Sequence, residues 1–244
     1  MEHSTTSWGG GQFRCRLKPA VPLPVTDGVL TLAADIHARF RALPGSGQIA
    51  SEFALTGALA WLRRSRPMRV LEIGAGIGCL SEVIRRWAVS DSGVFLNAEI
   101  ICVEDEPWCQ AQWQQNVRPL PPGLHLFDKA PLLVWWDFVL LDGPQMPADG
   151  WIALAQRGVI FVEGGRRAQR SELHRVLREA GRHSIEATWR PPDRSKGFSV
   201  VLCDPTPAEE VWFAAVRCHE WLRDLPLRLR GRPVGKRRAE EMPP

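Results

Sequence analysis

Short apolar runs alternate with stretches of helical periodicity from Met68 onward, and this alternation constrains the fold more than any other feature. The predicted strands are short and cover 68–73, 97–103, 124–127, 138–141 and 158–162. The predicted helices among and after them cover 79–87, 107–117, 151–156 and 166–180. Strands that alternate with helices form βαβ units, whose parallel strands are covered on both faces. The sequence therefore predicts an α/β protein with a doubly wound, mostly parallel sheet and helices on both faces.

The last two predicted strands, 184–190 and 197–203, break this alternation. Pro191, Pro192 and Asp193 lie between them and leave no room for a helix, so the two strands form an antiparallel hairpin at the sheet edge. A dinucleotide-binding Rossmann domain would continue with further βα units instead. Five parallel strands followed by a hairpin therefore predict a Rossmann-like seven-stranded sheet with an antiparallel C-terminal hairpin.

Two further helices are predicted before this core. Apolar residues recur at helical spacing in 29–43 and in 51–64, and Ser51 is placed to cap the second helix. The predicted organisation is a flexible arm (1–27), a helical region (28–66), the core (67–204), a C-terminal helix (205–226) and a basic disordered tail (227–244).

Basic residues are concentrated at the C-terminal end of the chain. The net charge is +4, and residues 223–244 contain seven basic and three acidic residues (7 − 3 = +4), so the rest of the chain sums to zero. Because a folded nucleic-acid-binding domain concentrates Lys and Arg on its own surface, this distribution argues against nucleic acid as a partner.

The apolar runs and the cysteines of the chain bear on its location and on membrane association. The first 13 residues lack the apolar stretch of a signal peptide. The longest apolar run, 130–141, is interrupted by Asp137 and is too short to cross a bilayer. The six cysteines form no C-x-x-C pair and no zinc-ligand spacing. The sequence therefore predicts a cytoplasmic protein without a membrane partner.

The strongest local motif is the strand-to-turn segment 70–78, which reads Val-Leu-Glu-Ile-Gly-Ala-Gly-Ile-Gly. Gly74 and Gly76 permit positive φ angles and a close approach of the backbone to a ligand. Cys79 stands where a nicotinamide-binding fingerprint needs its third glycine, which disfavours a nicotinamide-dependent oxidoreductase. Glu72 would repel a pyrophosphate and attract a cofactor that carries cationic groups.

A second acidic residue, Glu104, directly follows the next predicted strand. A carboxylate at the carboxyl end of that strand can accept hydrogen bonds from both ribose hydroxyls of an adenosine. Asp142 ends the fourth predicted strand, and Glu163 ends the fifth. Ligands of open α/β sheets bind at this edge, so the acidic residues are predicted to share one site.

The stretch 69–204 resembles the class I S-adenosylmethionine-dependent methyltransferases. The segment 70–78 resembles the family's first motif, and 136–143 resembles its fourth-strand motif. The segment 156–163 resembles the fifth-strand motif, although only Gly158 is present of its usual glycine pair. The turn Asp142-Gly143-Pro144, together with the hairpin, is most similar to the small-molecule O-methyltransferase branch.

This resemblance implies S-adenosylmethionine as the cofactor and a methyl transfer to a hydroxyl group of a small molecule by in-line displacement. The implied cofactor-binding residues are Glu72, Gly74, Ala75, Gly76, Gly78, Glu104, Asp105, Phe127, Asp128 and Asp142. Asp142 is the candidate general base, and His37 is a second candidate because the resemblance makes 28–66 a substrate lid. Glu163 and Arg166 are candidates for binding the acceptor.

Several alternatives remain open at the level of sequence. Some relatives in this branch hold a divalent cation, and here Asp142 and Glu163 stand at two of the ligand positions while Gly164 replaces the third, which favours a site without metal. An RNA or protein methyltransferase and a non-catalytic S-adenosylmethionine-binding protein are the alternative functions. The sequence also leaves a homodimer open.

Overall fold

The computed structural model describes residues 25–90, 98–130, 135–143, 153–164, 166–191, 193 and 196–229. Within these residues, seven strands form one sheet in the order β3-β2-β1-β4-β5-β7-β6. Their bounds are Arg69–Ile73 (β1), Glu99–Val103 (β2), Leu124–Phe127 (β3), Trp135–Leu141 (β4), Ala153–Glu163 (β5), Ser184–Trp189 (β6) and Phe198–Cys203 (β7). Strands β1 to β5 are parallel, and β7 pairs antiparallel with both β5 and β6. The predicted doubly wound sheet with a terminal hairpin is confirmed.

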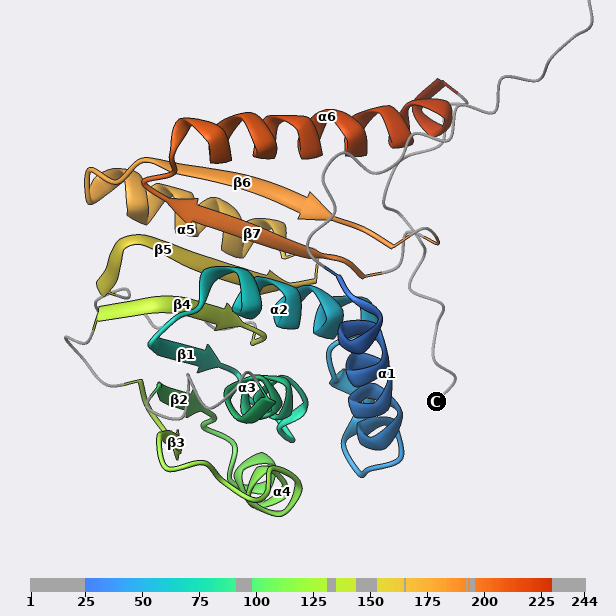
Figure 1. Cartoon of the computed structure of the whole chain (residues 1–244), viewed down its shortest axis with the longest axis vertical. Coiled ribbons are helices and arrows are strands. Elements are labelled where there is room, and N and C mark those ends of the chain that lie inside the picture. Colours follow the sequence, from blue (N-terminus) through green and yellow to red (C-terminus); the bar gives the residue numbers. More distant parts are fainter. Residues whose placement is uncertain are drawn as a thin grey trace, which may run out of the picture.

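Helices cover both faces of this sheet (Figure 1). Their bounds are Asp27–Arg41 (α1), Glu52–Ser65 (α2), Cys79–Ser90 (α3), Pro107–Asn116 (α4), Arg167–Glu179 (α5) and Pro207–Leu229 (α6). One hydrophobic core lies beneath α1, α2, α3, α4 and α6. A smaller core, which includes Leu173 and Leu177 of α5, lies on the opposite face.

Helix α2 belongs to the main core. Ser51 caps it as predicted, because its hydroxyl accepts a hydrogen bond from the backbone N–H of Ala54 (3.2 Å). Residues 54–62 of this helix are all buried. Its Gly57 packs so closely on β7 that an added Cβ would lie 2.3 Å from the Phe198 ring. Part of the predicted region 28–66 is therefore structural, and its role as a substrate lid stays a prediction.

The predicted helix over 151–156 is wrong where the structure describes it. Residues from Ala153 onward belong to β5, in which Ala153 and Leu154 pair with Trp135 and Trp136 of β4. The first two residues of that prediction lie outside the described residues. The sequence Ala-Leu-Ala-Gln favours a helix locally. Pairing with the first residues of β4 instead holds this segment in an extended strand conformation.

The predicted arm (1–27) and tail (227–244) lie almost entirely outside the described residues. Between them, none of the described helices is long and apolar enough to span a membrane.

Candidate functional site

The candidate site lies where the winding of the sheet reverses. From β1 the chain continues to β2 on one side, whereas β4 returns to the other side of β1. The backbone N–H of Asp142, just after β4, donates to the carbonyl of Ile73 at the end of β1 (2.9 Å). Open α/β sheets bind ligands outside the carboxyl ends of their strands at such a reversal. Glu72, Glu104, Asp142 and Glu163 all come from strand ends on this edge.

The glycine-rich turn after β1 is held against β2. The N–H groups of Gly74 and Ala75 both donate to the carbonyl of Val103 (3.0 Å each). Gly74, Gly76 and Gly78 have φ values of +81°, +54° and +97°. All three conformations favour glycine.

These glycines differ in what surrounds them. An added Cβ at Gly74 would meet the backbone of Gly143, and one at Gly78 would lie 2.5 Å from Val117. A Cβ at Gly76 would meet nothing within 4 Å. Gly74 and Gly78 therefore permit packing within the protein, whereas Gly76 borders open space.

Glu104 ties the turn to the end of β2. One carboxylate oxygen accepts the N–H of Gly76 (2.6 Å), and the other accepts the N–H of Glu106 (3.0 Å). The side chain is 8% exposed. Because each carboxylate oxygen accepts more than one hydrogen bond, Glu104 remains able to bind a further donor at the surface of this turn.

Glu72 is fully buried beneath the turn. One of its oxygens accepts the Ser81 hydroxyl (2.5 Å), and Ser81 in turn accepts the indole N–H of Trp113 (2.6 Å). The other oxygen, Oε1, has no N–H or O–H donor among the described residues. Burial raises the pKa of Glu72 to about 7, against the opposing effect of the hydrogen bonds from Ser81 and from the Cys102 thiol. Sequence reasoning missed Ser81 and Trp113, although Ser81 stands in the first turn of the helix that follows the glycines.

Asp142, Glu163 and Arg166 form an ion cluster at the ends of β4 and β5. Arg166 Nη2 lies 3.3 Å from Oδ1 of Asp142 and 3.6 Å from Oε2 of Glu163. Arg166 also donates to the backbone carbonyls of Asp142 (2.8 Å) and Glu163 (3.0 Å). Burial and the neighbouring Glu163 raise the pKa of Asp142 well above its ordinary value, and Arg166 opposes this shift.

The cluster does not fit a divalent cation. The guanidinium of Arg166 already stands against both carboxylates. Across the parts of the chain that the structure describes, no three His, Cys, Asp or Glu side chains come together as metal ligands. A hard cation such as Mg²⁺ needs oxygen ligands on most sides. Asp142 and Glu163 therefore do not form the metal site that the sequence left open.

Arg166 is held by its surroundings as well. It stands at the N-terminal boundary of α5. One turn further along, the Gln169 side chain donates to the backbone carbonyl of Gly143 (3.0 Å). Arg166 and Gln169 thus hold Asp142 and Gly143 at the end of β4, and no sequence pattern pointed to Gln169.

The other predicted site residues lie at the periphery. Asp105, Phe127 and Asp128 are exposed at the ends of β2 and β3. His37, on α1, lies 3.9 Å from Glu52 at the start of α2, and burial lowers its pKa. His37 thus contacts Glu52, and no hydrogen bond or ion pair joins it to Asp142.

Comparison with known proteins identifies the fold. No protein-family model matches the chain, and no curated protein matches its sequence. The O-methyltransferase TomG from Streptomyces achromogenes, solved with SAM, is similar with a TM-score of 0.51 and 18% identity, over 74% of this chain and 91% of that one. The O-methyltransferase from Bacillus cereus, solved with SAH, is similar with a TM-score of 0.51 and 13% identity, over 73% of this chain and 91% of that one. The fold is that of class I S-adenosylmethionine-dependent methyltransferases, as the sequence resemblance implied.

Proposed function

We propose that this chain binds S-adenosylmethionine at the carboxyl ends of β1, β2 and β4 and transfers the methyl group to a hydroxyl of a small molecule. The observation that carries the proposal is a group of carboxyls from three adjacent strands. Glu104 contributes to the raised pKa of Glu72, and Glu72 contributes to that of Asp142. Mutual repulsion among these groups favours a ligand with positive charge, such as an ammonium or a sulfonium, over a pyrophosphate.

The residues at this edge fit such a cofactor. The buried Oε1 of Glu72 lacks an N–H or O–H donor among the described residues, and the space beside Gly76 is open. We infer that Glu72 and the turn 74–78 hold the methionyl part and that Glu104 holds the ribose. Asp105, Phe127 and Asp128 are the proposed contacts around the adenosine, because they are exposed beside Glu104 at the ends of β2 and β3.

When bound, S-adenosylmethionine supplies an electrophilic methyl group. The chain must then orient the acceptor and take up its hydroxyl proton. Asp142 is the proposed general base, because its raised pKa makes it a stronger proton acceptor than an ordinary aspartate. Arg166 holds Asp142 in place, and Glu163 is the proposed contact for the acceptor. His37 remains a second candidate base.

Helix α1 and the loop that follows it are the proposed cover of this site. An added Cβ at Gly45 would lie 2.7 Å from the Trp108 ring and 3.0 Å from Ile77, which belongs to the glycine-rich turn. The loop therefore lies against the segment proposed to hold the cofactor. Its closeness supports a lid that encloses a small acceptor better than a large one.

Calorimetric titration with S-adenosylmethionine, S-adenosylhomocysteine and NAD tests the cofactor. Binding of the first two should weaken at least tenfold in Glu104→Gln. The matched control, Glu99→Gln, changes a half-buried glutamate at the start of β2 and should bind as the wild type does. Binding of NAD alone, or of none of the three, would overturn the proposal.

The acceptor is tested separately, with hydroxylated small molecules, RNA and protein offered under identical conditions. Methylation of small-molecule hydroxyls supports the proposal. Transfer to RNA or protein only, or cofactor binding without turnover on any acceptor, would favour one of the alternative functions.

A further inference from the structure

The sheet ends in an open edge that the proposed methyl transfer does not use. Strand β6 is the last in the strand order and pairs with β7 alone among the described strands. An edge strand offers a row of backbone donors and acceptors to any extended chain that lies beside it.

The hydrogen-bond pattern shows which residues of β6 face outward. His183 and Asp204 are the opposed pair next to the first pair of the β6–β7 ladder, Ser184 and Cys203. The N–H of Asp204 donates to the carbonyl of His183 (2.8 Å). Opposed residues of an antiparallel ladder alternate between bonded and non-bonded pairs. The odd-numbered residues of β6 therefore bond to β7, and the N–H and C=O groups of Ser184, Glu186 and Thr188 point away from the sheet.

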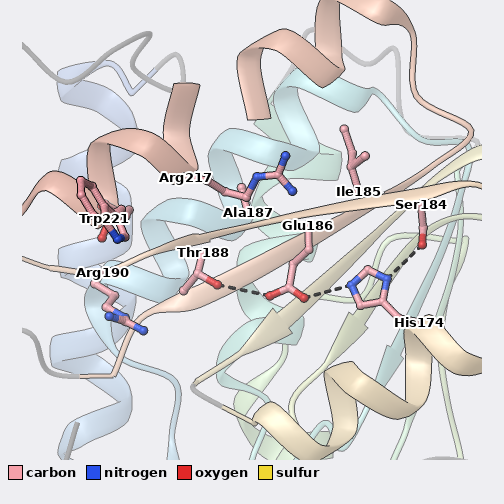
Figure 2. A pocket seen from close by; sticks show the side chains of 10 residues that line it. His174, Ser184, Ile185, Glu186, Ala187, Thr188, Arg190, Arg217 and Trp221 are labelled. Carbon is pink, nitrogen blue, oxygen red and sulfur yellow. Dashed lines mark hydrogen bonds and ion pairs between the residues drawn. The ribbon is translucent and has the colours of Figure 1, made fainter. Parts of the chain in front are cut away.

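These three residues line a groove of about 480 Å³ between two helices (Figure 2). His174 of α5 forms one wall, and Arg217 and Trp221 of α6 form the other. An open strand edge between two helical walls has the shape that receives an extended peptide.

The α5 side of the groove is already fixed by internal contacts. The carboxylate of Glu186 is hydrogen-bonded to both Arg170 and His174 (3.0 Å to His174). Thr188 is hydrogen-bonded to Ser199 (2.7 Å) and accepts from Arg170 (3.1 Å). The side chains of β6 are thus engaged within the protein, and its outward backbone groups are what the edge offers a partner.

The charge at the groove is positive. Glu186 is compensated by Arg170, and Glu220 on the α6 wall is compensated by Arg223 (2.8 Å). Arg217, which is exposed, adds a positive charge to the α6 wall.

The pKa values agree with a positive potential. Besides burial, Arg190 and Arg167 lower the pKa of Arg170. Besides burial, Arg170 and Arg178 lower the pKa of His174. Nearby cations thus disfavour further positive charge at this wall. The same positive potential attracts a ligand with acidic side chains.

We propose that this groove binds an acidic, extended segment of a partner protein, which adds to the sheet as a further strand beside β6. Main-chain hydrogen bonds to Ser184, Glu186 and Thr188 would supply affinity, and Arg217 would select for acidic side chains. A second copy of the chain fits less well. Two-fold pairing of β6 with β6 would bring the α6 wall of one copy beside that of the other, and Arg217 beside Arg217.

The experiment uses fluorescently labelled peptides of about ten residues and the full-length chain. An alternating Thr-Glu peptide is compared with an alternating Thr-Lys peptide by fluorescence anisotropy. The acidic peptide should bind at least tenfold more tightly. N-methylation of alternate amides along one edge of the acidic peptide should abolish binding, whereas the same modification along the other edge should leave it unchanged.

Two variants of Ser184 isolate the backbone contact. Both Ser184→Ala and Ser184→Pro remove the hydroxyl that contacts His174, but only proline removes the outward N–H. Position 184 is the first of β6, where proline removes no ladder bond. Ser184→Ala should bind as the wild type does, and Ser184→Pro should bind at least tenfold more weakly. Circular dichroism verifies that both variants fold, and the N-methylated peptides give the same information without any variant.

Charge selection has its own pair of variants. Arg217→Glu should weaken the acidic peptide at least tenfold, and Arg41→Glu, an equal charge change at an exposed position of α1, should not. The proposal is overturned if the acidic and basic peptides bind equally or if the two Ser184 variants behave alike. It is also overturned if light scattering shows a dimer that only Ser184→Pro dissociates, since a second copy would then occupy the edge.

Discussion

Gly74 lies against Gly143 so closely that a Cβ added to Gly74 would be 2.6 Å from the amide nitrogen of Gly143. This contact, which we call the Gly74–Gly143 seam, joins the turn after β1 to the turn after β4 where the winding of the sheet reverses. Both partners are backbone, so neither can rotate away as a side chain would. The seam therefore fixes the relative position of the proposed cofactor turn and the proposed base, Asp142.

Alanine substitutions at Gly74 and Gly76 should separate packing from ligand space. Gly74→Ala should lower the free energy of unfolding by about 3 kcal/mol, because it combines a backbone clash with a strained φ. Gly76→Ala adds only strain, about 1 kcal/mol, but fills the open space and should weaken S-adenosylmethionine at least tenfold. Urea denaturation and calorimetry measure the two effects. Equal stability of the two variants would contradict the role assigned to the seam.

Glu72 should make the protein less stable as the pH rises. Its pKa is raised from 4.5 to about 7 on folding, so the native state binds more protons than the unfolded state between these values. The unfolding free energy then falls across that interval, by on the order of 3 kcal/mol for this group.

Glu72→Gln should remove this dependence. Relative to the wild type, the variant should gain stability from pH 4.5 to pH 7.5, as measured by urea denaturation at several pH values. Glu99→Gln, on the surface of the same sheet region, is the control and should run parallel to the wild type. Parallel curves for Glu72→Gln as well would show that Glu72 does not hold an extra proton in the native state.

The succession of parallel strands and the terminal hairpin were predictable from the sequence, because local patterns mark the strands and turns. Glycine-rich turns, apolar runs and the Pro-Pro-Asp segment mark where β1 ends and where the hairpin turns, and the cap at Ser51 follows from one residue type. The extended course of β5 from Ala153 was not predictable, because it depends on pairing with Trp135 and Trp136 of another strand.

The candidate site was predictable in its acids and less so in their partners. Glu72 is the last residue but one of β1, and Glu104 and Asp142 directly follow β2 and β4, which a sequence shows. The contacts of Ser81 with Glu72 and of Arg166 with Asp142 join elements that are separate in the sequence. Side-chain direction decides such contacts, and no periodicity encodes it. Arg166 in particular, a sequence candidate for binding the acceptor, lies against the carboxylates of Asp142 and Glu163.

Gly57 tests the inclusion of α2 in the core. Gly57→Ala places a methyl group 2.3 Å from the Phe198 ring and should reduce the unfolding free energy by about 2–3 kcal/mol. Gly47→Ala, in the short 3₁₀ helix η1 (Ser46–Gln48) before α2, meets nothing within 4 Å and should change the unfolding free energy by less than about 0.5 kcal/mol. Thermal and urea unfolding compare the two. A neutral Gly57→Ala would mean that α2 rests more loosely on the sheet.

Arg166 should serve as the cation of the Asp142–Glu163 pair. Arg166→Met leaves the buried carboxyl of Glu163 and the largely buried carboxyl of Asp142 without compensation, and should lower the unfolding free energy by roughly 3 kcal/mol at pH 8. Because Arg166 lowers the pKa of Asp142, its loss raises that pKa further, so the defect should shrink as the pH falls to 5.5. The neighbouring, exposed Arg167→Met is the control.

Addition of EDTA or Mg²⁺ should leave the Tm of the wild type unchanged. A Mg²⁺-dependent rise in Tm of the wild-type protein would mean that a cation displaces Arg166.

Asp142→Asn tests the proposed base directly. Asparagine keeps the size of the side chain and can still accept from Arg166, but it cannot take up a proton. Turnover should fall by at least about 100-fold, the usual contribution of a positioned base, while S-adenosylmethionine affinity stays nearly intact. Because the base acts when ionised, kcat/KM of the wild type should rise with pH until the raised pKa of Asp142 is passed. Glu99→Gln again controls for the loss of one carboxylate. Full activity of Asp142→Asn would remove Asp142 from the chemistry and direct attention to His37.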